Sequence, residues 1–220
     1  PLLKGYFVTG TGTGEGKTFV TRGLARHARR LGVDVAALKP IETGVAPEPL
    51  DAIAIARAAG RPELAHLPGL YRVTPPVAPF TATLRGEPPV PPNAALREVV
   101  LGVTADLLLV EGAGGVLVPL DYERSVADLI TSLRLPAILV ARNALGVMSH
   151  TRAAFEALSH RAIPVAAVVL TEHGPHDESQ RDNLVVLRQL LPGPLVRFPS
   201  TRDDDDELAD AAAELWAVLG

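Results

Sequence analysis

The stretch Gly10-Thr11-Gly12-Thr13-Gly14-Glu15-Gly16-Lys17-Thr18 decides the fold of this chain. An apolar segment, Tyr6-Phe7-Val8, precedes it, and a helical pattern begins at Lys17. Four glycines let backbone N–H groups turn inward around a polyphosphate, and a helix N-terminus adds partial positive charge behind them. Lys17 can reach the terminal phosphates, and the Thr18 hydroxyl can bind Mg²⁺. A tight strand-to-helix turn needs fewer glycines, so the stretch is interpreted as a nucleotide-binding phosphate loop. Five residues rather than the usual four separate its first glycine from the Gly-Lys pair.

Composition favours a single domain built around an aliphatic core. The chain has 220 residues, of which 47% are hydrophobic but only 4% aromatic, which suits a parallel sheet covered by helices. The absence of cysteine excludes disulfides, thiolate nucleophiles and cysteine metal sites. The net charge is −4, and the basic residues between Arg22 and Arg30 are expected to form the solvated face of a helix. The sequence therefore gives no support for nucleic-acid binding.

The sequence also predicts a cytoplasmic protein. No segment reaches the roughly 18 consecutive apolar residues that a membrane span needs, so no membrane partner is expected. The N-terminal segment is interpreted as a strand and not as a signal peptide.

Short apolar runs alternate with helical patterns along the whole chain. The expected strands are 5–9, 34–39, 106–111, 137–141, 164–170 and 194–198. The expected helices are 17–31, 51–59, 93–101, 126–133, 149–161, 178–190 and 206–219. This alternation predicts an α/β fold across residues 1–220, a P-loop NTPase-like, mostly parallel sheet flanked by helices on both faces. Ligands are expected beyond the carboxyl ends of the strands.

Two segments interrupt the alternation. The stretch 67–92 is rich in proline and is interpreted as an ordered surface excursion, with a loop over the site as the alternative. The run Asp203–Asp206 is interpreted as an acidic helix start that complements the helix dipole, with cation binding as the alternative.

Polar residues follow the second and third long strands. Lys39 ends one strand and Thr43 follows it, and Lys39 is expected to point into the ligand crevice. Glu111 follows the other, where a phosphate-loop enzyme needs an acid to hold Mg²⁺ beside the Ser/Thr hydroxyl. Asp51 has two open interpretations, a helix N-cap or a second Mg²⁺ ligand. His150 is interpreted as a capping or packing histidine.

Taken together, these segments resemble the dethiobiotin synthetase family. The resemblance is carried, in the family's order, by residues 8–18, Lys39-Pro40 with Thr43-Gly44, Val110-Glu111-Gly112-Ala113-Gly114-Gly115, Leu145-Gly146 with His150, and the helix 183–191. It implies a homodimer that uses ATP, Mg²⁺ and CO₂ (or bicarbonate) to convert 7,8-diaminopelargonic acid to dethiobiotin, ADP and phosphate. An amine takes up CO₂ as a carbamate, the carbamate attacks the γ-phosphate, and the second amine closes the ureido ring.

The resemblance also implies the site residues. Lys17 and Lys39 would be catalytic, and Thr18, Asp51 and Glu111 would hold the metal. The residues expected to bind substrate are Thr13, Lys39, Thr43, Gly114, Gly146 and Asn183, the last two reaching the carboxylate tail from a partner subunit. The residues expected to bind nucleotide and its metal are Gly12, Thr13, Gly14, Glu15, Gly16, Lys17, Thr18, Phe19, Asp51, Glu111, Gly112, Ala113, Gly114, Thr171, Glu172 and Pro199.

One departure bears on the nucleotide. Thr171-Glu172 stands where many family members have the asparagine that reads adenine. A threonine hydroxyl cannot present an amide's fixed donor and acceptor, so a looser base preference is a hypothesis.

Three other classes of protein fit the sequence less well. A partition-type regulatory ATPase would carry an extra lysine early in the phosphate loop, and none lies between Gly10 and Gly16. A cobyrinate-type amidotransferase would need a glutaminase domain, normally with a cysteine nucleophile, and the chain has no cysteine. A pure binding module would leave Lys39 and Glu111 unexplained.

Overall fold

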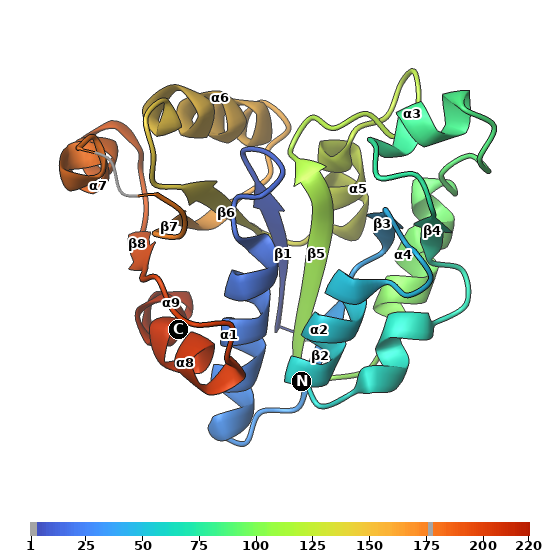
Figure 1. Ribbon diagram of the computed structural model, residues 1–220, viewed down its shortest axis with the longest axis horizontal. Coiled ribbons are helices and arrows are strands. Elements are labelled where there is room, and N and C mark those ends of the chain that lie inside the picture. Colours follow the sequence, from blue (N-terminus) through green and yellow to red (C-terminus); the bar gives the residue numbers. More distant parts are fainter. Residues whose placement is uncertain (1–3, 176–177) are drawn as a thin grey trace.

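Six parallel strands form the centre of the computed structural model, which describes residues 4–175 and 178–220 (Figure 1). The strands are β1 (Lys4–Gly10), β2 (Val35–Leu38), β5 (Leu107–Gly115), β6 (Ala137–Arg142), β7 (Val165–Thr171) and β8 (Leu195–Phe198). Their order in the sheet is β2-β5-β1-β6-β7-β8, and every neighbouring pair is parallel. All six strands expected from the sequence are present, and the α/β fold is confirmed.

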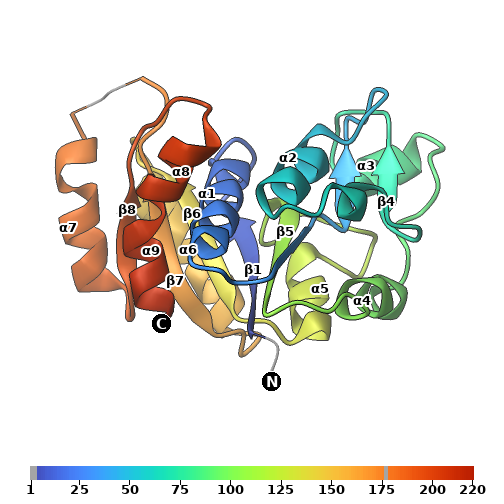
Figure 2. The ribbon, with the colours of Figure 1, turned by 90° about the horizontal axis from the view of Figure 1, so that it is seen from below.

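Helices cover both faces of this sheet (Figure 2). One face carries α1 (Lys17–Arg30), α2 (Leu50–Ala58), α8 (Asp205–Ala211) and α9 (Ala213–Leu219). The other face carries α4 (Asn93–Leu101), α5 (Val126–Leu133), α6 (Val147–Ser159) and α7 (Gln180–Leu190). Along β1, Tyr6 and Val8 point to the first face and Phe7 to the second, because side chains alternate along a strand. In the part of the chain that the structure describes, no helix is long and apolar enough to cross a membrane.

The proline-rich stretch is an ordered excursion, as favoured from the sequence. It contains β4 (Tyr71–Val73) and α3 (Pro79–Leu84), and the short 3-10 helix η1 (Pro62–His66) precedes it. β4 pairs in parallel with β3 (Ile41–Thr43), so the excursion is joined to the segment that follows β2. The side chains of Tyr71 and Val73 are buried, and burying residues of this size stabilises a fold by about 1.5–3 kcal/mol each. β3 and β4 span three residues each, too short to show a strand pattern in the sequence.

The expectation that the basic face of α1 is solvated holds for Arg30, which is exposed, but not for Arg22, whose side chain is mostly covered. Arg22 donates to Asp203 and Asp205, and Arg30 pairs with Asp206 and Asp210, so the basic helix face meets the acidic run. Figures 1 and 2 both place α8 beside α1. The acidic run also starts α8, as expected, and Asp204 accepts hydrogen bonds from two amides of its first turn. The expected helix 206–219 is divided, since α8 ends at Ala211 and α9 begins at Ala213.

The start of α5 is held by its own first turn. Ser125, the N-cap residue, donates both its backbone N–H and its hydroxyl to one carboxylate oxygen of Asp128, at 2.7 and 2.6 Å. Partial burial works against the charged carboxylate, but these hydrogen bonds hold the pKa of Asp128 below its ordinary value.

The parallel arrangement brings the carboxyl ends of the strands to one edge of the sheet. β5 is longer than expected from the sequence, because it continues past Glu111 to Gly115. The pairing shifts register after Val8, so that Gly10 at the end of β1 lies opposite Gly115. Glu111 therefore sits within a strand and not in a turn, and its position is fixed by backbone pairing.

Candidate active site at the carboxyl ends of the strands

The phosphate loop connects β1 to α1 at this edge. Gly14 and Gly16 have φ values of +77° and +92°, a left-handed conformation that favours glycine. Gly16 is the N-cap of α1, and no side chain among the described residues caps this helix N-terminus. The first amides of α1 are thus available to an anion.

Lys17 and Lys39 bring two ammonium groups to the loop. The Nζ of Lys17 donates to the carbonyl of Gly12 at 2.9 Å. Burial lowers the pKa of Lys17, and the charge of Lys39 works in the same direction, against the attraction of Glu111. The Nζ of Lys39 donates to Glu111 Oε1 at 2.6 Å and to Asp51 Oδ2 at 2.7 Å. Burial disfavours this charge, but the two carboxylates outweigh burial and raise the pKa of Lys39 above its ordinary value.

The carboxylate of Glu111 is the centre of the charged cluster. Its side chain is fully buried, and Oε1 accepts from both Lys39 and the Thr18 hydroxyl, the latter at 2.9 Å. Its second oxygen, Oε2, has no hydrogen-bond partner among the described residues. A buried carboxylate oxygen without a partner is costly, which indicates that a bound group satisfies it. Thr18, Asp51 and Glu111 offer hard oxygen atoms, the donors that Mg²⁺ prefers, so these residues fit a magnesium ion.

Glu42 is a site residue that the sequence analysis missed. Its carboxylate accepts from the amides of Asp51 and Ala52, at 2.9 and 3.1 Å, and so caps the N-terminus of α2. The N-cap interpretation of Asp51 is wrong, because α2 begins at Leu50 and the capping carboxylate comes from β3. Burial raises the pKa of Glu42. In the sequence, the only signal for Glu42 as a site residue is its position shortly after the Lys39-Pro40 pair.

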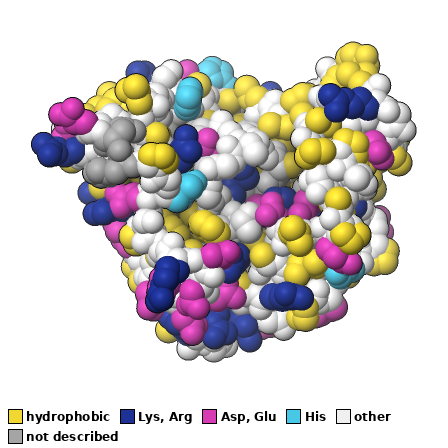
Figure 3. Space-filling model, in the orientation of Figure 1, with side chains coloured by type: hydrophobic (Ala, Val, Ile, Leu, Met, Phe, Trp, Pro, Cys, Tyr) yellow, Lys and Arg dark blue, Asp and Glu magenta, His cyan; other side chains and the backbone are white. Residues whose placement is uncertain are grey.

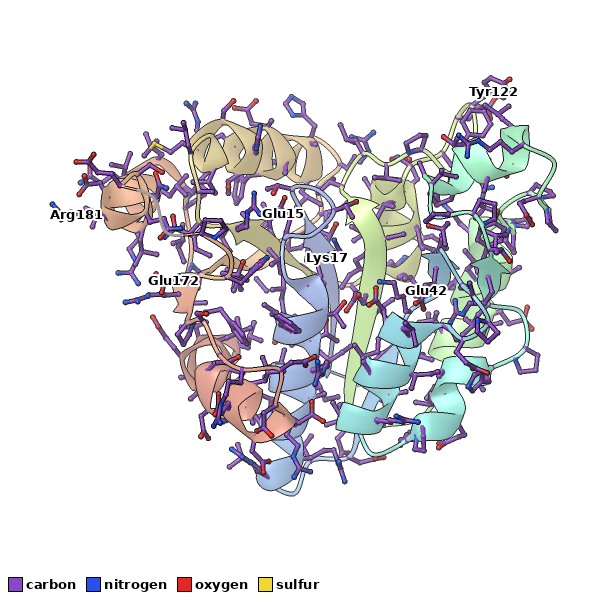
Figure 4. All side chains as sticks on the ribbon, in the orientation of Figure 1. Glu15, Lys17, Glu42, Tyr122, Glu172 and Arg181 are labelled. Atoms are coloured by element: carbon purple, nitrogen blue, oxygen red, sulfur yellow. The ribbon has the colours of Figure 1, made fainter. Side chains whose placement is uncertain are left out.

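These groups surround a cavity of about 380 Å³. Figure 3 shows charged side chains of both signs in a recess on this face of the molecule. In Figure 4, Glu42 and Lys17 lie toward the cavity from opposite sides. The residues expected from the sequence that line it are Thr13, Gly14, Glu15, Gly16, Lys17, Thr18, Phe19, Lys39, Thr43, Asp51, Glu111, Ala113 and Gly114. Glu42 and His173 line it as well, and neither was expected.

Other expected site residues lie outside this cavity's lining. Gly12 lines a second cavity, of about 450 Å³, together with His150. Thr13 lines both cavities. Gly112 contacts Phe7, whose ring a Cβ at Gly112 would meet at 2.7 Å. Glu172 forms an ion pair with Arg197 at 2.5 Å.

Three further expected residues lie around the sheet edge. Asn183 is buried, and its amide donates to Asn143 Oδ1 at 2.9 Å. Gly146 is the N-cap of α6, and Pro199 follows β8. Both residues are exposed. The substrate roles of Gly146 and Asn183 and the nucleotide role of Pro199 stay predictions.

Comparisons with known proteins place the chain among phosphate-loop enzymes. A family model described as an AAA domain matches residues 4–196. An ATP-dependent dethiobiotin synthetase of Anaeromyxobacter dehalogenans (strain 2CP-1) is 37% identical over 99% of this chain and 98% of its own. The synthetase of Anaeromyxobacter sp. (strain K) is 41% identical over the same shares, and that of Mycobacterium avium (strain 104) is 40% identical over 84% and 85%.

Solved structures show the same fold at low sequence identity. The septum site-determining protein MinD of Pyrococcus horikoshii, complexed with Mg-ADP, has a TM-score of 0.57 at 16% identity, over 94% of this chain and 86% of its own. A ParA family ATPase from Chlorobium tepidum has a TM-score of 0.55 at 14% identity, over 98% and 92%. At this identity the likeness concerns the fold alone.

Proposed function

The chain belongs to the ATP-dependent dethiobiotin synthetase family, and we propose that it is a ligase of biotin synthesis acting in the cytoplasm. It would join CO₂ to 7,8-diaminopelargonic acid and close the ureido ring of dethiobiotin, converting ATP to ADP and phosphate. The observation that carries this proposal is the buried ammonium of Lys39, held by two carboxylates in the cavity that the phosphate loop lines.

The proposed reaction transfers a phosphoryl group to a carbamate. One amine of the diamine attacks CO₂ and loses a proton, which gives a carbamate. A carbamate oxygen then attacks the γ-phosphorus, and ADP leaves. The second amine attacks the carbonyl carbon of the resulting anhydride, phosphate leaves, and the ring closes with loss of the amine's proton. Lys17 and Lys39 offset the negative charge of the carbamate and the transferring phosphoryl group.

Thr18, Asp51 and Glu111 would hold Mg²⁺. When bound, the ion supplies positive charge to the phosphate oxygens. The partnerless Oε2 of Glu111 and the hydroxyl of Thr18 at 2.9 Å from Oε1 support this assignment.

Thr13, Thr43 and Gly114 would contact the carbamate end of the substrate, because all three line the same cavity as Lys39. The carboxylate tail would extend to Gly146 and Asn183 of a second copy of the chain in a homodimer. The family resemblance supports this dimer.

The experiment that tests the proposed function is a coupled ADP-release assay with and without 7,8-diaminopelargonic acid and bicarbonate. A synthetase releases ADP in proportion to the diamine consumed and forms dethiobiotin, which mass spectrometry detects. A partition-type ATPase switch would release ADP equally well without the diamine, and that result would refute the proposal.

A further inference from the structure

Two side chains at and just after the end of β7 hydrogen-bond to backbone carbonyls of the phosphate loop. The Thr171 hydroxyl donates to the carbonyl oxygen of Glu15 at 2.7 Å. The Nε2 of His173 lies 2.9 Å from the carbonyl oxygen of Gly14 and donates a hydrogen bond to it, because a carbonyl can only accept. Two consecutive carbonyls of the loop are therefore held by residues 156 and 159 positions away in the chain.

These contacts determine where the loop amides point. In a planar trans peptide, the C=O of one residue and the N–H of the next point in opposite directions. Fixing the Gly14 carbonyl turns the Glu15 N–H away from β7, and fixing the Glu15 carbonyl does the same for the Gly16 N–H. Both amides then face the inside of the loop, where a polyphosphate would lie.

Further contacts hold this arrangement in place. The Glu15 carboxylate accepts from the backbone N–H of Arg142, at the end of β6, at 2.6 Å. The His173 ring meets Phe19 edge to face, with ring centroids 6.4 Å apart. A Cβ at Gly16 would lie 3.0 Å from the Thr171 side chain and 3.1 Å from the His173 ring, so this glycine permits the close approach. The loop is thus anchored to the ends of β6 and β7 as well as to its own strand.

We propose that Thr171 and His173 are positioning residues that hold the phosphate loop in its polyphosphate-binding conformation. Their hydrogen bonds to Glu15 and Gly14 orient the loop amides before the triphosphate arrives, which reduces the ordering cost of binding. The one proton of the Thr171 hydroxyl is donated to the loop, so Thr171 cannot also donate to a base. The proposal rests on the proposed function only in taking this loop as the ATP phosphate site.

The test compares paired substitutions by calorimetric titration with MgATP and by steady-state kinetics. Thr171→Val and His173→Phe remove one donor each while keeping size and ring packing, and we expect each to raise the Kd and the KM for ATP about five- to tenfold. The KM for the diamine should not change. Thr171→Ser and His173→Gln restore a donor and should bring both constants back to within about threefold of wild type.

Three outcomes would overturn the proposal. The first is a wild-type Kd for MgATP in both donor-deleted variants. The second is a parallel rise of the KM for ATP and for the diamine, which would indicate general damage. The third is the same loss in the serine and glutamine variants. Should Thr171→Val not fold, His173→Phe decides alone, since His173 is only half-buried. If the wild type itself fails to bind MgATP, the proposed function fails as well. If the wild type turns over and the variants bind MgATP with wild-type Kd, only the positioning role of Thr171 and His173 is refuted.

Discussion

Replacing Lys39 with methionine removes the buried ammonium while keeping a side chain of similar length. The Lys39 side chain is 7% exposed, and Glu111, its partner at 2.6 Å, is fully buried. Taking one member from a buried ion pair costs about 3–5 kcal/mol, because the remaining charge is left without compensation. Losing a preorganised charge at the reacting oxygens lowers kcat by about 100- to 1,000-fold. Lys39→Met should therefore lose both stability and turnover while still binding ATP through the intact loop.

Urea unfolding, calorimetry with MgATP and single-turnover ADP release separate these effects. Of the three lysines in the chain, Lys4 is the matched control. It begins β1, about 20 Å from the loop that follows this seven-residue strand, so Lys4→Met should leave kcat unchanged. The double variant Lys39→Met with Glu111→Gln removes the uncompensated charge. It should regain stability without regaining turnover.

The reasoning fails if Lys39→Met keeps kcat within tenfold of wild type, since the ammonium would then not act on the reaction. An unchanged free energy of unfolding in the single variant would refute the buried-pair argument. Recovery of turnover in the double variant would show that the loss came from folding and not from chemistry.

Three other predictions follow from local structure. The Thr171 proton is donated to the loop and Glu172 pairs with Arg197, so neither side chain offers the donor and acceptor pair of an amide. Rates with ATP, CTP and GTP should therefore differ by less than about tenfold, and a strong ATP preference contradicts this. Gly23→Ala should destabilise the protein by about 1–3 kcal/mol in urea unfolding, because the new Cβ would lie 2.4 Å from the carbonyl oxygen of Leu208. Alanine favours a helix more than glycine does, so a stabilised variant would refute the packing argument. The pKa of Asp128 is lower in the folded state, so its carboxylate stabilises the fold above its ordinary pKa of 3.8, and this stabilisation is lost as the pH falls through the folded-state pKa. Asp128→Asn should cost about 1 kcal/mol at pH 7, and the gap to wild type should narrow in unfolding measurements as the pH is lowered below 3.8.

The fold and the charged cluster apart from Glu42 could be predicted from the sequence because they depend on local patterns. The spacing of glycines before Lys17 specifies a loop between a strand and a helix, and alternating apolar runs specify parallel strands. In a parallel sheet all carboxyl ends lie at one edge, so Lys39 and Glu111 had to approach the loop. Their meeting at 2.6 Å agrees with that expectation.

The tertiary structure decided what depends on contacts between distant segments. The sequence predicts a solvated basic face at Arg22–Arg30 and a helix start at Asp203–Asp206, but the ion pairs between them appear only when α8 lies beside α1. Glu42 and His173 carry no motif, and each acts on backbone groups of another segment. A sequence pattern encodes the period of an element and the chemistry of its turns, which are properties of neighbouring residues. Strand order and the partners of a buried carboxylate or a loop carbonyl are set by packing of the whole chain, and so they appear only once the chain is folded.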